Sequence, residues 1–309
     1  MGGRWQYRIK AQSAMEYLMT YGWAILIIAV VLGALFELGV FSGTFFMPHV
    51  PPGSCHVFRP YGSRTVGSIN LEGECQGALP QYVAEFNGKS SISTGYVQTS
   101  VTEYAISAWI KTTYSGGVPI LQDRGSGAGD SVTLEVGYNG GQGVHSGAVN
   151  CGVDSNGVWI GGYSTQTVNN GNWHFIVCIF TSASGNVITP SDISVYVDGR
   201  SAGLITTDIG SVTSPISGLG STMIGYHQAW GQYAMGDIAN VQVYNKSLDQ
   251  NSITTLYSEG IGGAPVDLQN LIAWWPLNGN ANDYSGNNND GTASNVIYTT
   301  NWESGYTQP

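Results

Sequence analysis

Short runs of β-branched and aromatic residues, separated by turn dipeptides, dominate the sequence from about residue 79 onward. The runs are YVAEF, YAISAWIKT, SVTLEVGY, HFIVCIF, ISVYVDG, ANVQVY and LIAWWPL. Asn-Gly, Gly-Gly, Asp-Gly and Ser-Gly pairs lie between them, and Asp198-Gly199 marks a hairpin. Many short strands with few helical stretches predict an antiparallel β-sandwich. One helix is expected in SLDQNSITTLYSEG, with Ser247 as its N-cap and Gly260 as its end.

The charge balance limits the kinds of partner that this chain can have. Only 10% of its residues are charged, and the formal net charge is -10. Three of the basic residues precede the first apolar segment, so seven basic residues face twenty acidic ones after Lys10. No basic patch is available to displace counterions, which argues against nucleic acid as a partner.

An apolar segment near the N-terminus adds a second feature. Between Tyr17 and Phe41 the only charged residue is Glu37. As a helix these residues would extend about 37 Å, enough to cross a bilayer core. The basic residues before the segment predict a cytoplasmic N-terminus and an exterior remainder. We therefore expect the α+β class, with a long N-terminal hydrophobic α-helix followed by an antiparallel β-sandwich of the jelly-roll type.

The segment has three interpretations. A cleaved secretory signal would have a shorter apolar core and a small-residue cleavage site, and ELGVFSGTFFMPHV contains no clean site. An uncleaved signal anchor explains the length and the charge asymmetry, but it leaves Glu16 and the preceding KAQSAME without a role.

The third interpretation is a resemblance. IKAQSAMEYLMTYGWAILIIAVVLGALFELGVF resembles the class III signal peptide and N-terminal helix of archaeal type IV pilins and archaellins. The resemblance implies cleavage by a prepilin peptidase after Lys10 and Ala11, so that Gln12 becomes the first mature residue. Many members of the family have glycine at the position of Ala11. It also implies a leader at 1–11 and an assembly helix at 12–46.

Glu16 has a physical role in this interpretation. A carboxylate deep in hydrocarbon costs about 2.5–3.5 kcal/mol or more and needs a partner. Cleavage creates a new α-amine at Gln12, which can pair with Glu16 of a neighbouring subunit. An ordinary interfacial glutamate is the alternative.

The strand-rich part resembles the laminin G-like branch of the concanavalin A-like lectin/glucanase superfamily. The stretches that carry the resemblance are FNGKSSISTG, YAISAWIKT, NWHFIVCIF, DISVYVDGRSAG, GDIANVQVYNKSL and WWPLNGNANDYSGNNNDGT. It implies a jelly-roll head domain at 79–309, preceded by a linker at 47–78. The WPLNG block usually begins such a domain, whereas here it closes the chain, which a circular permutation would explain.

The four cysteines show no zinc-ligand spacing. For an exported chain the simplest pairing by sequence proximity is Cys55 with Cys75 and Cys151 with Cys178. Two other connectivities, and free buried thiols, remain open.

The chain lacks the usual signatures of hydrolases. Glu135 is alone in its strand, without the paired carboxylates of a glucanase, and no G-x-S-x-G sequence is present. We therefore expect a binding protein and no enzyme activity.

Calcium is the one expected cofactor. Asp283, Asn287 and Asp290 supply oxygen ligands of the kind that Ca²⁺ takes, and calcium usage in the superfamily favours Asp283. Against this, Ala239 and Asn240 stand where the superfamily often has acidic residues. A turn cluster that caps strand ends is the alternative.

The loop IGYHQAWGQYAMG is the candidate glycan-binding element, since aromatic faces stack on sugar rings. Its candidate residues are Tyr226, His227, Trp230 and Tyr233, and core or rim aromatics are the alternative. Asn245 begins the sequon Asn245-Lys246-Ser247, a candidate glycosylation site that also fits an unmodified strand end.

The sequence thus predicts a subunit of an extracellular pilus-like or archaellum-like filament. The precursor would reside in the cell membrane and meet the prepilin peptidase and the pilus assembly machinery. The mature chains would form a helical homopolymer on the cell surface, with heads that adhere to glycans or to other cells. A membrane-anchored lectin-like receptor that does not polymerise, or a low-copy tip pilin, is the alternative.

Overall fold

The computed structural model describes residues 19, 21–33, 79–95, 103–125, 131–140, 143–155, 157–182, 187–206, 211–213 and 219–309. Residues 1–50 and 51–309 form two separate compact units. In the first unit the described part is helical at 21–33, and in the second it is a β-sandwich.

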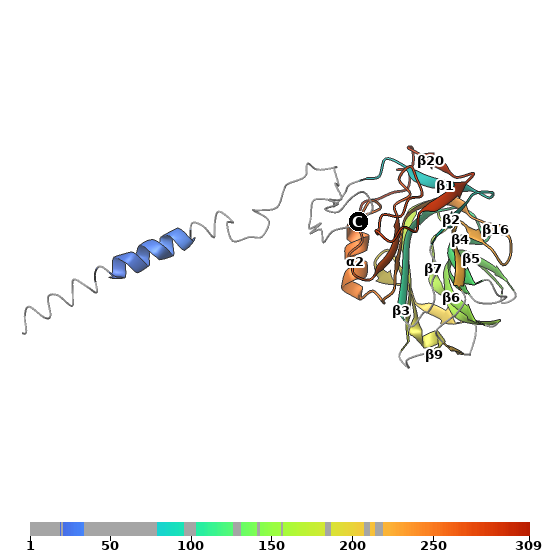
Figure 1. Ribbon diagram of the computed structural model, residues 1–309, viewed down its shortest axis with the longest axis horizontal. Helices are drawn as coiled ribbons and strands as arrows, with labels where there is room; N and C mark the ends of the chain where they lie inside the picture. Colours follow the sequence, from blue (N-terminus) through green and yellow to red (C-terminus); the bar gives the residue numbers. More distant parts are fainter. Residues whose placement is uncertain are drawn as a thin grey trace, which may run out of the picture. The chain divides into compact units, whose positions relative to one another are not determined.

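Two antiparallel sheets form the sandwich (Figure 1). Sheet A runs in the order β11 (Arg200–Ser201), β10 (Ile193–Val197), β8 (Trp173–Thr181), β3 (Glu103–Lys111), β17 (Met235–Tyr244), β1 (Val83–Asn87) and β20 (Ile297–Thr299), and β18 (Leu271–Trp275) also pairs with β17. Sheet B runs in the order β12 (Leu204–Thr206), β7 (Val158–Thr167), β6 (Gly143–Ser155), β5 (Ser131–Gly140), β4 (Val118–Gly125), β14 (Leu219–Ile224), β2 (Ser91–Thr94) and β19 (Gly291–Ser294). Two short ribbons pair β9 (Val187–Ile188) with β13 (Val212–Thr213), and β15 (Tyr226–His227) with β16 (Gln232–Tyr233).

The expected α+β class is wrong, whereas the expected jelly-roll sandwich fits. The described α-helices are the segment at 21–33 and α2 (Gln250–Ser258), and both are short. Within the described residues, no helix has both the length and the apolarity that a membrane crossing requires. The class prediction failed because it gave a single apolar segment the weight of a structural layer, whereas the described fold is almost entirely antiparallel sheet.

The main core lies between the sheets. Alternate residues on β5 point inward, namely Val132, Leu134 and Val136, and all three are fully buried. They pack with inward residues of sheet A such as Ile106 and Phe180. Burial of these apolar side chains is the main source of stability.

A second apolar cluster covers the outer face of sheet A. The ring of Trp109 on β3 lies 5.5 Å from that of Phe175 and 5.9 Å from that of Tyr257 on α2, measured between centroids. The helix begins at Asp249, whose side chain accepts a hydrogen bond from the Ser252 amide at 2.7 Å. The expected N-cap, Ser247, is wrong, because its hydroxyl instead donates to Glu103 Oε2 at 3.5 Å.

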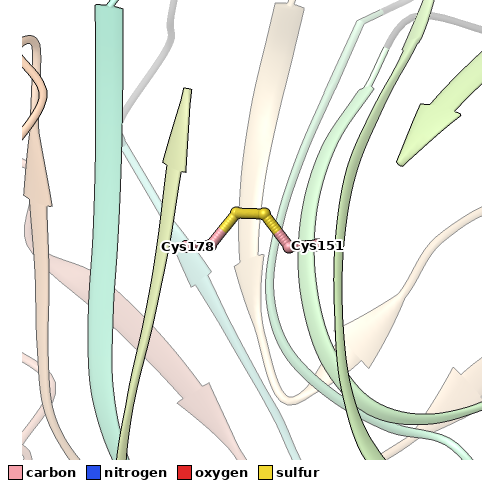
Figure 2. Close-up of a disulfide and its surroundings, with 2 residues drawn as sticks. All are labelled: Cys151 and Cys178. Carbon is pink, nitrogen blue, oxygen red and sulfur yellow. A yellow bond between two sulfur atoms is a disulfide. The ribbon is translucent and has the colours of Figure 1, made fainter. Parts of the chain in front are cut away.

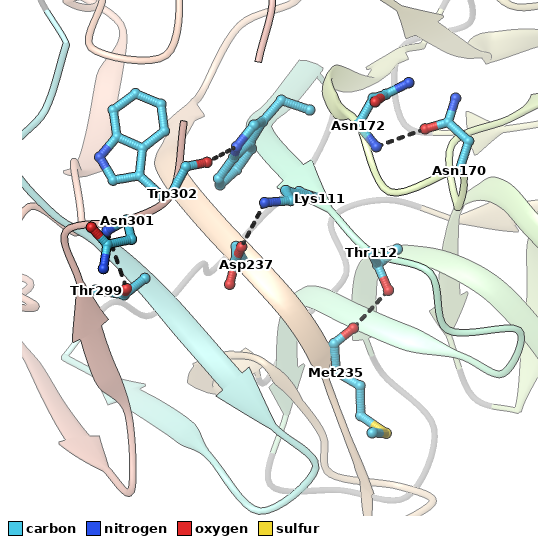
Figure 3. Close-up of polar contacts among 10 residues, drawn as sticks. Lys111, Thr112, Asn170, Asn172, Met235, Asp237, Thr299, Asn301 and Trp302 are labelled. Atoms are coloured by element: carbon cyan, nitrogen blue, oxygen red, sulfur yellow. Dashed lines mark hydrogen bonds and ion pairs between the residues drawn. The ribbon is translucent and has the colours of Figure 1, made fainter. Parts of the chain in front are cut away.

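Strand β17 pairs with three strands of sheet A, and on one edge its partner changes halfway along its length. Asn240 has a positive φ of 50° and interrupts the pairing, so β17 pairs with β1 before this residue and with β18 after it. On its other edge β17 pairs with β3, where Lys111 and Asp237 form an ion pair at 3.7 Å (Figure 3).

The C-terminal segment completes both sheets. Strand β19 pairs with β2 in sheet B, and β20 pairs with β1 in sheet A. Near the end of the chain, the carbonyl oxygen of Trp302 accepts a hydrogen bond from Trp173 Nε1 at 2.9 Å (Figure 3). The first and last described strands of the sandwich, β1 and β20, are therefore neighbours, and the circular permutation stays a prediction.

A disulfide joins the two sheets. It connects Cys151 on β6 with Cys178 on β8, and the two Cα atoms are 5.7 Å apart (Figure 2). The pairing of these two cysteines is confirmed. Cys55 and Cys75, the leader at 1–11, the linker at 47–78 and the residues Lys10, Ala11, Gln12 and Glu16 lie outside the described residues.

Candidate functional site

A pocket of about 260 Å³ lies on the outer face of sheet B, below the hairpin formed by β15 and β16. Its lining residues are Arg124, Ser131, Glu135, Asp154, Trp159, His227, Ala229 and Trp230. We call this site the outer pocket. Its volume is slightly below the range of about 300–1,000 Å³ that small-molecule sites occupy.

The floor of the outer pocket follows from strand alternation. Because Val132, Leu134 and Val136 point into the core, the residues that alternate with them along β5 point outward. Ser131 and Glu135 are two of these outward residues, and the strand is covered on both faces.

Strand register brings the charged residues together. Arg124 on β4 is opposite Ser131 on β5, which is opposite Asp154 on β6, and Asp154 is opposite Trp159 on β7. Directly opposite residues in antiparallel strands point to the same face. A cation, a hydroxyl, a carboxylate and an indole therefore lie in one row across the sheet.

Two glycines make room for the indole of Trp159. A Cβ atom on Gly152 would overlap the Trp159 ring, and one on Gly161 would lie 2.9 Å from its Cζ2 atom. The ring therefore lies against the backbone of β6 and β7, where only glycine allows such close approach.

Polar side chains attach the hairpin to the sheet. Gln122 on β4 contacts His227 Nε2 at 3.1 Å through its amide nitrogen and accepts a hydrogen bond from the Gln228 amide at 2.6 Å. On the other side of the hairpin, Gln232 Nε2 donates to the Gly117 carbonyl at 2.8 Å. These bonds hold His227 and Trp230 over the outer pocket.

Trp230 forms the aromatic wall of the outer pocket. Half of its surface is exposed, and its ring stacks on that of His227 with a centroid distance of 4.4 Å and an interplanar angle of 13°. Burial, with a smaller effect from Arg124, lowers the pKa of His227 to about 4. The imidazole is therefore neutral at physiological pH and supports the indole as an uncharged ring.

Glu135 lies at the bottom of the outer pocket and is 1% exposed. Its Oε1 atom accepts a hydrogen bond from Asn150 Nδ2 at 2.8 Å. Burial raises the pKa of this carboxyl to about 7, although the bond from Asn150 acts in the opposite direction. A carboxyl in such an environment is shared between its neutral and charged forms near neutral pH.

The candidate glycan-binding residues divide into two pairs. His227 and Trp230 line the outer pocket. Tyr226 and Tyr233 are not among its lining residues, and their rings pack against each other across β15 and β16 with centroids 4.5 Å apart. This aromatic pair holds the hairpin together.

Sequence reasoning missed Arg124, Glu135, Asp154 and Trp159 as site residues. A signal was present in SVTLEVGY, where polar residues alternate with core residues along one strand. The other residues come from different strands, and only the register places them together.

The calcium candidates form a network of turns. Asp283 Oδ1 accepts hydrogen bonds from the amides of Trp274 and Ser285, and its Oδ2 accepts from the Ser285 hydroxyl and the Asn289 amide. With four donors on two oxygens, no lone pair of this carboxylate is directed at a cation.

The other two candidates also contribute to the turns. Asp290 Oδ1 accepts from the Asp283 amide at 3.0 Å, and Asn287 Nδ2 donates to the carbonyls of Leu271 and Ile272. Within the described residues, no group of three His, Cys, Asp or Glu side chains is placed to hold a metal. In this arrangement the three side chains do not fit a calcium site, and calcium binding stays an untested prediction.

Asn245, the sequon residue, directly follows β17 and is exposed. Its backbone amide donates to the Asn270 carbonyl at 2.9 Å. Its glycosylation stays a prediction.

Two facing antiparallel sheets, with an aromatic-walled polar pocket on the outside of one of them, define a lectin-like β-sandwich protein. A family model described as the concanavalin A-like lectin/glucanases superfamily, of the laminin G type, matches residues 86–254. This match covers more than half of the chain, so the protein belongs to that superfamily. No curated protein matches the sequence.

Solved structures with similar folds include three from different organisms. A Bacteroides ovatus ATCC 8483 protein, to which carbohydrate binding is ascribed, matches with a TM-score of 0.52 and 18% identity, over 71% of this chain and 60% of its own. The heptameric SAP-like pentraxin of Limulus polyphemus matches with a TM-score of 0.48 and 16% identity, over 71% and 94% of the two chains. Domain 4 of the arabinanase AbnA from Geobacillus stearothermophilus, solved with arabinotriose, matches with a TM-score of 0.42 and 18% identity, over 58% and 81%.

At these identities the similarity shows the fold alone. The chain also spans less than two thirds of the Bacteroides protein. None of these matches supports the pilin resemblance of residues 1–46, which remains a prediction.

Proposed function

We propose that this protein binds carbohydrate in the outer pocket and acts as a non-enzymatic adhesion protein. The observation that carries the proposal is the half-exposed Trp230 ring, stacked on His227 beside Arg124 and Asp154. A sugar presents an apolar C–H face and a rim of hydroxyls. The indole suits the C–H face, and the guanidinium of Arg124 and the carboxylate of Asp154 suit the hydroxyls.

A glycan microarray probed with the purified full-length protein tests this function. We expect binding to a restricted set of oligosaccharides. Trp230→Ala should weaken binding at least about tenfold, because the stacking surface is lost. Tyr114→Ala is the matched control, since Tyr114 is an exposed aromatic residue that does not line the outer pocket. Equal glycan binding by Trp230→Ala and wild type would refute the outer pocket as the binding site.

A second proposal concerns the N-terminal segment, and the observation that favours it is the spacing of Lys10, Ala11, Gln12 and Glu16. A prepilin peptidase would process the membrane precursor, and the mature chains would assemble into a filament that displays the heads outside the cell. A membrane-anchored receptor or a low-copy tip pilin is the alternative.

Intact mass and N-terminal sequencing of the protein from cells test this second proposal. A mature chain that begins at Gln12 supports processing, and Glu16→Ala then tests assembly. A mature chain that retains Arg4 and Lys10 would contradict prepilin processing and would support the alternative, a membrane-anchored receptor.

A further inference from the structure

One oxygen of Glu135 has no hydrogen-bond partner among the described residues. Asn150 donates to Oε1, whereas Oε2 is buried and receives no bond. Its cross-strand neighbour on β4 is Pro119, whose side chain has no donor. Buried polar atoms are nearly always paired, so an unpaired carboxyl oxygen on a side chain that lines a pocket points to a ligand.

The bond from Asn150 determines where a proton resides on this carboxyl. Because Oε1 accepts from the amide, the proton of the neutral acid occupies Oε2. Burial raises the pKa of Glu135 to about 7, so the neutral acid is the main form in mildly acidic solution. In that form Oε2 is a hydrogen-bond donor.

Three other charged or titratable side chains line the outer pocket, and Tyr163 on β7 lies in the same cross-strand row as Glu135, beyond Asn150. Arg124 on β4 and Asp154 on β6 carry opposite formal charges, and His227 on β15 is neutral above a pKa of about 4. Glu135 therefore determines the net charge of the outer pocket. A bound sugar displaces water from the site, which makes an ionised Glu135 still more costly.

We propose that Glu135 is a ligand-contacting residue that binds sugar as a neutral carboxylic acid, donating its Oε2 proton to a sugar oxygen. This inference rests on the proposed carbohydrate binding in the outer pocket. Its consequence is that the protein holds sugar in mildly acidic surroundings and releases it in alkaline ones.

The size of the effect follows from the fraction of binding-competent protein. With a pKa of about 7, Glu135 is a neutral acid in nearly all chains at pH 5.5, whereas at pH 8.5 it is neutral in about one chain in 30. The apparent dissociation constant should therefore rise by up to about 30-fold between these pH values.

The test is a fluorescence titration of the full chain at pH 5.5 and pH 8.5. The probes are methyl β-glucoside, methyl β-galactoside, methyl α-mannoside and arabinotriose, together with every glycan retained on the array. Wild type should bind at least tenfold more weakly at pH 8.5. Glu135→Gln, which offers an amide N–H and cannot ionise, should bind equally at both.

Glu259→Gln is the matched control. Burial raises the pKa of Glu259 to about 7 as well, but this residue does not line the outer pocket. The control should keep the pH dependence of wild type, and circular dichroism at both pH values should confirm that each variant is folded.

The outcomes separate the two proposals. Binding that depends on Trp230 but is equal at both pH values in wild type overturns the role of Glu135 and leaves the proposed function standing. Unchanged pH dependence in Glu135→Gln overturns that role as well. If no probe and no arrayed glycan binds at either pH, both proposals fail.

Discussion

The disulfide between β6 and β8 leads to the most quantitative prediction. Cys151 and Cys178 are separated by 27 residues in the sequence and link sheet B to sheet A. Closing a loop of this length lowers the entropy of the unfolded chain by about 12 cal/mol/K in the chain-entropy treatment. At 25 °C the bridge should therefore contribute about 3.5 kcal/mol to the free energy of unfolding.

The perturbation is the double variant Cys151→Ala/Cys178→Ala, measured by guanidinium unfolding in comparison with wild type. The free energy of unfolding should fall by about 3.5 kcal/mol, which for a domain of this size lowers Tm by about 7–14 °C. The m-value should rise, because the unfolded chain expands and exposes more surface once the cross-link is gone.

A reductant provides the control. Reduced wild type should approach the stability of the double variant, and the double variant should not change with reductant. A loss below about 1 kcal/mol with an unchanged m-value would refute the argument, since an effective cross-link must restrict the unfolded chain.

Three further predictions concern stability. Burial raises the pKa of Glu135 from an ordinary value of 4.5 to about 7, so the folded state binds more protons than the unfolded state between these pH values. The free energy of unfolding of wild type should therefore fall by about 3 kcal/mol relative to that of Glu135→Gln as the pH rises from 4.5 to 7. Denaturant titrations at several pH values measure this, and parallel curves of stability against pH for the two proteins would contradict it. Asp283→Ala should lower the free energy of unfolding by about 3 kcal/mol, because it removes four hydrogen bonds. Adding EDTA to wild type should not lower its stability, and a fall in the Tm of wild type with EDTA would instead indicate a bound cation. Trp302→Ala should lower the free energy of unfolding by about 3–5 kcal/mol, because the Trp302 ring is 1% exposed and its Nε1 atom donates to the Pro80 carbonyl. Thermal or chemical unfolding measures this loss, and a loss under about 1 kcal/mol would mean that the C-terminal segment does not stabilise the sandwich.

Local patterns predicted much of the sandwich. The run SVTLEVGY became β5, and the Asp198-Gly199 pair formed the hairpin tip with positive φ at both residues. These features succeed because alternation and turn chemistry are encoded within a few neighbouring residues. Gly260 also ends α2 with a positive φ, as expected.

The site could be predicted only in part, because its residues meet through register. Trp230 and His227 share one loop, so their aromatic grouping was visible in the sequence. Arg124 and Asp154 are 30 positions apart in the sequence and share one row, on either side of Ser131, only through the pairing of three strands. A one-residue slip would turn each to the opposite face, so sequence spacing carries no such information.

The hydrogen bonds of Asp283 show another limit of sequence reasoning. Asp283 has the oxygen atoms that a cation would take, but backbone amides from β18 and the following turn occupy them. Backbone donors are the same for every residue type, so the sequence gives no sign of this competition.

The position of β1 determines how the sandwich would carry mechanical tension. β1 is the first described strand of the sandwich and lies between β17 and β20, with antiparallel hydrogen bonds to both. A pulling force applied along β1 from residue 79 would load both ladders in shear, with their hydrogen bonds sharing the force. The disulfide would transmit part of that force between the sheets through covalent bonds. The head would thus withstand pulling from its N-terminal side better than peeling from β20, which is paired along one edge only.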